Sequence, residues 1–203
     1  MAVVNDLPTA SGSFVKLNYI QGQGSQYIDA GFYSNGRTEF ECKWNNMRAT
    51  STSNTDMSMF GARNNYNDNQ FQLTDFANDS VTGYLGLSRD SLRRYDLHYA
   101  GNTDIITSWR NGVITTGTGY TYSVAPDDWV QNFRLIIFGS RNSSWTAGEI
   151  ATFRLYYLKF WYNGMLIKDF IPVRKLSNGE VCLYDKVGKL FYTNQGTGSF
   201  IGG

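Results

Sequence analysis

The segment Phe153-Arg154-Leu155-Tyr156-Tyr157-Leu158-Lys159-Phe160-Trp161-Tyr162 decides the fold class, because apolar and aromatic side chains occupy both of its alternating positions. It predicts a β-strand at the centre of a sheet, with little water on either face. Successive side chains leave a strand on opposite faces, so both sets cannot enter one core. The two sets are Phe153, Leu155, Tyr157, Lys159 and Trp161, and Arg154, Tyr156, Leu158, Phe160 and Tyr162. We expect a loop, a neighbouring subunit or a ligand to cover one face.

Tight hairpin turns are expected to connect the strands. Asn-Gly pairs occur at Asn35-Gly36, Asn111-Gly112, Asn163-Gly164 and Asn178-Gly179, and such a pair supplies the two positive-φ residues of a type I′ turn. Between them the sequence holds about a dozen short strand-like segments and no amphipathic helix. We therefore predict an all-β fold with little or no helix, a two-sheet antiparallel jelly-roll sandwich.

Composition indicates an ordered domain and excludes several classes of protein. Aromatic residues make up 16% of the 203 residues and charged residues only 17%, below the roughly 25% of an average soluble protein. This composition excludes disorder. The formal net charge of +1 gives no field that would attract a polyanion, so nucleic acid is not an expected partner. No apolar stretch approaches the roughly 18 residues of a membrane span, and residues 1–12 lack the pattern of a signal peptide. No membrane insertion is expected.

The chain divides into a polar lead-in, residues 1–13, and a single predicted domain, residues 14–203. Long polar loops, which on a rigid sandwich often carry recognition sites, are expected at Asn45–Asp56, Asn64–Asn69, Ala125–Asn132 and Ser140–Gly148. Cys42 alternates with Phe40 and Trp44, which predicts a buried free thiol in preference to a Cys42–Cys182 disulfide.

Residues near both ends of the chain carry a resemblance to a known family. Near the start these are Leu17–Ile20, Gly24–Gly31 and Phe60–Arg63; near the end, and more specific, are Asn163–Pro172, Gly179–Asp185 and Lys189–Phe200. From about residue 14 onward the chain resembles the concanavalin A-like, laminin-G-like jelly-roll domains of bacteriophage structural proteins and gut bacterial surface proteins. The middle of the chain matches only in outline.

The resemblance implies a two-sheet jelly roll whose relatives commonly bind carbohydrate, and some of which are glucanases. This sequence departs from the glucanases, because no strand carries their closely spaced Glu-x-Asp-x-Glu acids. Glycoside hydrolysis needs two carboxyl groups on one surface. The nearest candidates, Glu39 and Glu41, share a row with Lys43, which is typical of the solvent face of a strand. His98 has no serine or cysteine motif beside it. We predict no catalytic residues and no enzymatic activity, with glycoside hydrolase as the less favoured alternative.

Metal binding is only weakly indicated. Oxygen ligands for calcium could come from Asn65, Asn67, Asp68 and Asn69, or from Asp127 with Asp128. The same residue types are common in ordinary turns. No cofactor is therefore predicted, and calcium stays open.

Sugar recognition needs flat apolar rings to stack on pyranose faces and polar groups to bind hydroxyls. Aromatic rings stand where predicted strands give way to loops, and polar residues lie beside them. The candidate carbohydrate-binding residues are Tyr66, Trp109, Trp129, Trp145, Asp29, Asn67 and Asn142. For each ring the alternative is that it folds down over the edge of the core.

These observations predict a non-catalytic, lectin-like adhesion module on the surface of a phage virion (tail, fibre or capsid) or, alternatively, of a bacterial cell, with a host-surface glycan as its partner. The other interpretation is a capsid decoration or head-fibre protein that contacts another virion protein. Abundant Tyr, Asn and Ser suit protein interfaces as well as sugars. A homo-oligomer, with a trimer as first expectation, would cover the doubly apolar strand through Tyr156, Phe160 and Tyr162.

Overall fold

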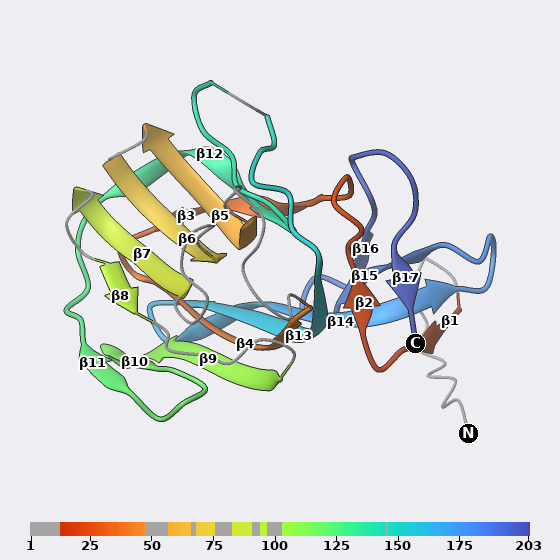
Figure 1. The fold of residues 1–203 in the computed structure, drawn as a ribbon, viewed down its shortest axis with the longest axis horizontal. Helices are drawn as coiled ribbons and strands as arrows, with labels where there is room; N and C mark the ends of the chain where they lie inside the picture. Colours follow the sequence, from red (N-terminus) through yellow and green to blue (C-terminus); the bar gives the residue numbers. More distant parts are fainter. Residues whose placement is uncertain are drawn as a thin grey trace.

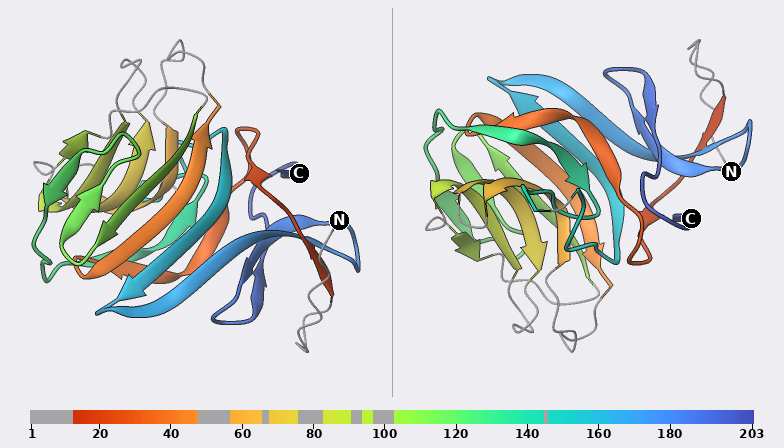
Figure 2. Two further views of the ribbon diagram at one scale, coloured as in Figure 1. Left: turned by 90° about the horizontal axis from the view of Figure 1, so that it is seen from below. Right: turned by 90° about the horizontal axis from the view of Figure 1, so that it is seen from above.

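The computed structural model describes residues 13–47, 57–65, 68–75, 83–90, 94–96, 103–144 and 146–203. These residues form two antiparallel sheets that face each other, and no helix occurs among them (Figure 1). Figure 2 shows the two layers from the side, with the C-terminal strands projecting beyond the six-stranded layer. The predicted all-β sandwich is confirmed.

The larger sheet has eleven strands in the described part of the chain, and its main order is β11-β10-β9-β4-β13-β14-β15-β16. Its strands are β1 (Phe14–Lys16), β2 (Ile20–Gln21), β4 (Thr38–Asn46), β9 (Asp104–Arg110), β10 (Val113–Thr115), β11 (Thr121–Ser123), β13 (Phe153–Tyr162), β14 (Met165–Lys175), β15 (Val181–Asp185), β16 (Leu190–Tyr192) and β17 (Ile201–Gly202). β1 pairs with β14, and β2 pairs with β13 and β17, so both ends of the domain join this sheet.

The smaller sheet has six strands in the order β3-β12-β5-β6-β7-β8. They are β3 (Ile28–Asn35), β5 (Met57–Asn65), β6 (Asp68–Asp75), β7 (Gly83–Asp90), β8 (Arg94–Asp96) and β12 (Val130–Ile137). β5 extends to Asn65 and β6 begins at Asp68, which pairs with it, so most of the segment expected as a long loop at Asn64–Asn69 belongs to these two strands.

Two of the four Asn-Gly pairs adopt the predicted backbone. Both residues have positive φ at Asn111-Gly112 (51° and 74°) and at Asn163-Gly164 (48° and 76°), as a type I′ turn requires. Gly36 lacks a positive φ and is required for another reason, because a Cβ there would lie 2.2 Å from the Asp127 carbonyl oxygen. At the fourth pair only Gly179 has a positive φ.

The central strand β13 directs residues from both of its alternating sets into the same core. Opposite β4, Leu155 pairs with Trp44 and Tyr157 pairs with Lys43, so Tyr156 is an extra residue. This β-bulge shifts the alternation by one position. Residues of the first set before the bulge and of the second set after it are therefore buried in the same core: Phe153, Leu155, Leu158 and Phe160 are at most 3% exposed. The expectation that another element must cover one apolar set is wrong.

Four phenylalanine rings meet between the two sheets. Phe40 and Phe160 come from the larger sheet, and Phe60 and Phe71 from the smaller one. Phe60 lies 5.0 Å from Phe40 and 5.5 Å from Phe160 between ring centroids, both in edge-to-face geometry. All four rings are fully buried. This contact between rings joins the two sheets, and β13 contributes Phe160 to it from the segment that follows the bulge.

Cationic side chains cover the aromatic rings on the outer face of the larger sheet. The Arg110 guanidinium lies 3.7 Å from the ring centroid of Trp161, and the Lys43 ammonium lies 4.7 Å from that of Tyr156. Long cationic side chains can shield apolar surface while their charge stays in water. These rings are half-buried as a result, so side chains of the same sheet provide the cover expected from a subunit or ligand.

Both cysteines are free and buried, as predicted for Cys42. Cys42 belongs to the main core, whereas Cys182 lies in a second cluster with Phe14, Val173 and Tyr184. Burial raises the pKa of the Cys182 thiol to about 12. A disulfide between the two clusters does not form.

The shifted alternation of β13 predicts a difference between neighbouring residues. Phe160→Ala should lower the free energy of unfolding by about 3–5 kcal/mol, because it leaves a cavity among the four rings. Trp161→Ala should cost less than half as much, because its half-buried ring lies on the outer face. Urea unfolding followed by circular dichroism measures both. Equal losses would contradict this assignment of faces.

Candidate functional site

A polar hollow lies in the smaller sheet beside the part of β12 that does not pair with β5. β12 pairs with β5 only at Ile136 and Ile137, and its pairing with β3 has two shifts of register. Beyond β12 the chain returns beside β5, where the N–H of Arg63 donates to the carbonyl of Arg141 at 2.9 Å. Figure 1 shows this return as the loop above β12 and β5. The bulged strand and the returning loop leave space between them.

The hollow has a volume of about 390 Å³ and is open to solvent. This is near the lower end of the roughly 300–1,000 Å³ of ligand sites. Its wall combines one half-buried aromatic ring with hydroxyl, amide and guanidinium groups. The described residues that line it are Phe133, Arg141, Asn142, Ser143, Ser144 and Thr146.

Hydrogen bonds within the loop hold the wall in place. Ser140 and Gly148 exchange two backbone hydrogen bonds of 2.8 Å across its base. The Asn142 side-chain oxygen accepts the N–H of Ser144 at 2.8 Å, and the Arg141 Nε donates to the Thr146 carbonyl at 2.8 Å. A ligand would meet a preformed surface and order little of the chain.

Two residues with left-handed backbone mark the ends of the loop. Phe138 has a φ of 68° and Glu149 a φ of 50°, which is uncommon for residues other than glycine. The Phe138 ring is buried and stacks on Phe153 with centroids 4.4 Å apart. The Glu149 carboxylate accepts hydrogen bonds from Ser58 Oγ at 2.6 Å and Arg63 Nη2 at 2.7 Å. Core packing and an ion pair thus hold the two strained positions.

The positive charge of Arg141 is balanced by the carboxylate of Asp29. Its Nη1 donates to Asp29 Oδ2 at 3.2 Å, and the other Asp29 oxygen accepts the N–H of Gly31 at 2.9 Å. The two side chains are only 17% and 24% exposed. The arrangement favours short-range hydrogen bonding to a polar ligand over attraction of an ion.

One of the seven predicted carbohydrate-binding residues lines this hollow, namely Asn142, although the residue is only 7% exposed. Asp29 does not line it but accepts a hydrogen bond from Arg141, which does. Tyr66, Asn67 and Trp145 lie outside the described residues.

The other two predicted rings point into the core. Trp109 is 2% exposed and Trp129 is 3% exposed, and both belong to the main hydrophobic cluster. The expectation that they stand exposed for sugar stacking is wrong. Trp109 alternates inward on β9 with Ile105, while its polar neighbour Arg110 points to the outer face of the sheet.

Phe133 and Arg141 are the wall residues that sequence reasoning missed. The Ser140–Gly148 loop was expected to be a recognition loop, and the structure has a loop there. From the sequence, Phe133 cannot be distinguished from a residue of a regular strand, because a bulge leaves no clear mark in local sequence. The proximity of Arg141 to Asp29 depends on a contact over 112 positions of the chain.

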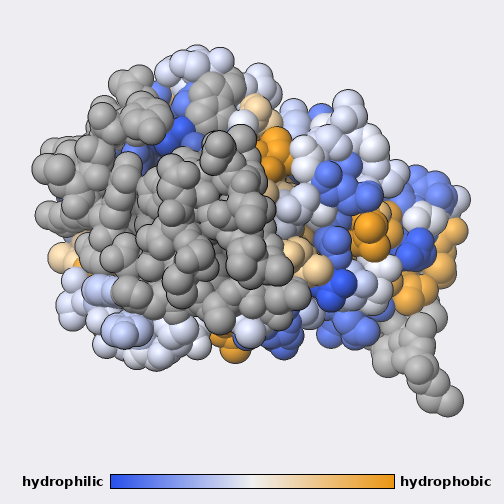
Figure 3. Space-filling view, viewed as in Figure 1, coloured by the Kyte–Doolittle hydropathy of each residue, from blue (hydrophilic) through white to orange (hydrophobic). Residues whose placement is uncertain are grey.

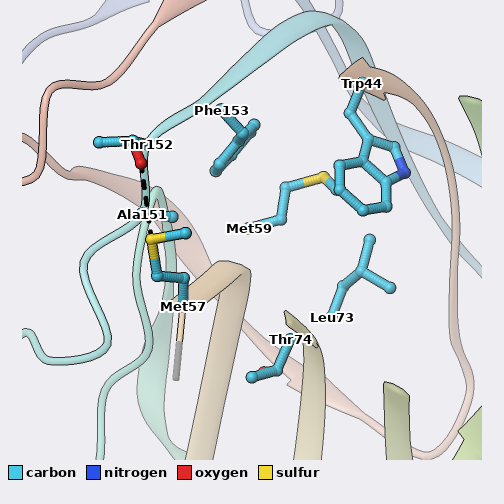
Figure 4. Close-up of a pocket in the computed structure, with 8 residues that line it drawn as sticks. All are labelled: Trp44, Met57, Met59, Leu73, Thr74, Ala151, Thr152 and Phe153. Atoms are coloured by element: carbon cyan, nitrogen blue, oxygen red, sulfur yellow. Dashed lines mark hydrogen bonds between the residues drawn. The ribbon is translucent and has the colours of Figure 1, made fainter. Parts of the chain in front are cut away.

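A second, apolar space lies between the two sheets at the end of β4. Trp44, Met57, Met59 and Phe153 converge on it, and Thr152 Oγ1 lies 3.6 Å from Met57 Sδ (Figure 4). Its volume is about 10 Å³, room for at most about one water molecule. The crevice is a packing feature of the core and too small for an organic ligand.

The predicted interface residues occupy different environments. Phe160 is fully buried in the core, so its assignment to an interface is wrong. Tyr156 is half-buried on the outer face, and its hydroxyl donates to Asp104 Oδ1 at 2.6 Å. Tyr162 is 41% exposed at the end of β13.

Two of the acidic residues considered in the sequence, Glu39 and Asp128, form ion pairs in the structure. Glu39 accepts from Arg110 Nη1 at 2.7 Å on the outer face of β4, and Asp128 accepts from Arg37 Nε at 2.8 Å. No group of three or more His, Cys, Asp or Glu residues that could hold a metal ion occurs among the described residues. His98 lies outside them, as does Asn67.

Comparisons with known proteins add no assignment to this geometry. Neither a scan against protein-family models nor a search of curated proteins finds a significant match to this chain. The concanavalin A-like resemblance therefore stays a prediction. The described residues include no helix of the length and apolarity that a membrane crossing requires.

The outer face also predicts a pH dependence of stability. Hydrogen bonds from Asn45 and then Tyr156 lower the pKa of Asp104, and burial together with this contact raises the pKa of Tyr156 to about 12. A folded-state pKa below the unfolded value of about 3.9 means that the carboxylate stabilises the fold above about pH 4. This contribution is lost as the pH falls through the folded-state pKa.

Asp104→Asn should therefore lose less thermal stability than the wild type between about pH 5 and pH 2, because it lacks the titrating carboxyl. Asn45→Ala, which removes the largest cause of the shift, should fall between the two. Melting temperatures from circular dichroism at each pH provide the comparison. An Asp104→Asn profile that matches the wild type over this range would refute the assignment.

Proposed function

We propose that this chain is a non-catalytic, lectin-like binding module of a bacteriophage virion, and that it binds glycan in the hollow between Phe133 and the Ser140–Gly148 loop. One observation carries the proposal: an open hollow of about 390 Å³ whose wall joins an aromatic ring to hydroxyl and amide groups and to one guanidinium, that of Arg141, which is paired with Asp29. The resemblance of the chain ends to phage jelly-roll proteins supports the place in a virion.

The chemistry of the wall suits a sugar. A pyranose presents C–H groups on its faces and hydroxyl groups around its edge. The half-buried Phe133 ring offers apolar surface for a face. Ser143, Ser144 and Thr146 are exposed and carry hydroxyls that both donate and accept. The volume limits the bound part to about one or two sugar rings.

Filling the hollow should abolish binding. Ser144 is exposed in the wall, so Ser144→Trp should place an indole in the space that the sugar needs. We expect a glycan array to show wild-type binding and a loss of at least about tenfold in the variant, since blocking removes the contacts that support affinity.

The matched control is Ser123→Trp, which puts the same ring on the exposed edge strand β11 of the other sheet. It should bind as the wild type does. Unchanged binding by Ser144→Trp, or no glycan binding by the wild type, would reject the hollow as a glycan site.

A second candidate function is assembly with other virion subunits. Tyr162 and Met165 are partners across the β13–β14 turn and are 41% and 71% exposed. Aromatic residues and methionine are enriched in protein interfaces. On the face in Figure 3, by contrast, hydrophobic residues over the C-terminal strands lie in separate spots between hydrophilic ones. The hairpin tip is therefore the described feature that best suits a decoration or head-fibre protein.

This second function predicts a homo-oligomer, with a trimer first, at micromolar concentration. Met165→Glu should reduce the mass measured by light scattering to that of one 22.9 kDa chain, because a charge cannot be buried unpaired in an interface. Leu176→Glu, at an exposed residue in a different turn, is the control and should leave the oligomer intact. A monomeric wild type would exclude self-assembly through this tip.

A further inference from the structure

We propose that Asp29 determines which class of sugar the hollow accepts, by neutralising Arg141 so that neutral sugars bind and acidic sugars do not. This inference rests on the proposed glycan-binding function and adds the class of ligand and the residue that selects it. Asp29 makes this selection from behind the wall, through Arg141.

Arg141 is the natural site for an anion in the hollow. Among the described residues of the wall it alone carries a charge; the others are Phe133, Asn142, Ser143, Ser144 and Thr146. A guanidinium binds carboxylates well because its N–H groups match the spacing of the two oxygens. Without a counterion, this wall would favour uronic or sialic acids over neutral sugars.

Asp29 occupies the carboxylate position from the protein side. Its Oδ2 accepts from Arg141 Nη1 at 3.2 Å, while Arg141 Nε donates to the Thr146 carbonyl at 2.8 Å. Because both side chains are less than a quarter exposed, their attraction is screened less than at an open surface. An acidic sugar would approach an ion pair of zero net charge.

The backbone keeps Asp29 in this position. Its Oδ1 accepts the N–H of Gly31 at 2.9 Å, and Gly31 has a φ of 77°. Asp29 also pairs with Ile136 in the β3–β12 ladder. The carboxylate is therefore held by a strand and does not depend on the loop for its orientation.

A second cation that contacts the loop is also paired. Arg63, which pairs with the loop through its backbone, forms an ion pair of 2.7 Å with Glu149. The two described cations at the loop between Ser140 and Glu149, which are Arg63 and Arg141, are thus each paired with a carboxylate. The exposed hydroxyls of Ser144 and Thr146 also line the hollow, and such groups suit a neutral sugar.

The test is Asp29→Asn, which keeps the size of the side chain and an oxygen to accept the Gly31 N–H but removes the negative charge. Wild type and variant are titrated by calorimetry with neutral disaccharides, lactose, maltose and N,N′-diacetylchitobiose, and with glucuronate- and sialate-terminated oligosaccharides. The wild type should prefer the neutral probes. The variant should gain at least about tenfold in relative affinity for the acidic probes, as expected for one charged hydrogen bond.

Asp29→Asn/Arg141→Gln is the matched control, and it should lose the gain because the cation is gone. Circular dichroism verifies that each variant is folded. A wild type that prefers acidic probes, or an Asp29→Asn variant with an unchanged ratio, overturns the role of Asp29 and leaves glycan binding intact. Absence of binding to every probe by all the proteins, together with a blank glycan array, overturns the proposed function itself.

Discussion

The rest of the structure depends on one constraint: the central strand β13 must place apolar residues from both of its alternating sets against a single facing sheet. The extra residue Tyr156 makes this possible, because the pairing with β4 shifts there by one position. Leu155 before the bulge and Phe160 after it are both fully buried. A regular strand would leave half of this apolar surface in water, at about 25 cal/mol per Å² of area.

The same shift determines what the outer face of the larger sheet can be. Tyr156 and Trp161 lie outward, each beneath a cation: Lys43 of the adjacent strand β4 covers Tyr156, and Arg110 of β9, one strand further away, covers Trp161. Carboxylates hold these cations in turn: Asp104 pairs with Lys43 and Glu39 with Arg110. The outer face of this sheet is thereby covered by its own side chains, and the open hollow lies at the smaller sheet, where β12 pairs with β5 only at Ile136 and Ile137.

Sequence alone could predict the fold because its signals are local. Alternating apolar residues and Asn-Gly pairs act over a few positions, and enough of them keep the expected geometry to define the strands: two of the four Asn-Gly pairs have the type I′ backbone. The site could be predicted only in part. The Ser140–Gly148 loop is recognisable from its polar composition, but Trp109 and Trp129 were misassigned because polar neighbours report the exposure of a turn and not of the ring beside it. Phe133 and Arg141 become wall residues only through a bulge and a contact across the fold, which no short stretch of sequence encodes.

The pairing of charged side chains explains why we propose a ligand that is recognised by its shape and hydroxyl groups and not by long-range electrostatic attraction. Only 17% of its residues are charged and the net charge is +1. In the described part of the chain the ion pairs include Arg37–Asp128, Lys43–Asp104, Arg63–Glu149, Arg110–Glu39, Arg141–Asp29 and Lys168–Asp185. Paired charges of opposite sign produce a potential that fades within a few ångströms of the surface, so long-range steering is weak. Selectivity must then come from contacts made after docking. The proposed site fits this requirement: its hollow carries hydroxyl groups, and hydrogen bonds hold the described residues of its loop, which would reduce the entropy lost on binding.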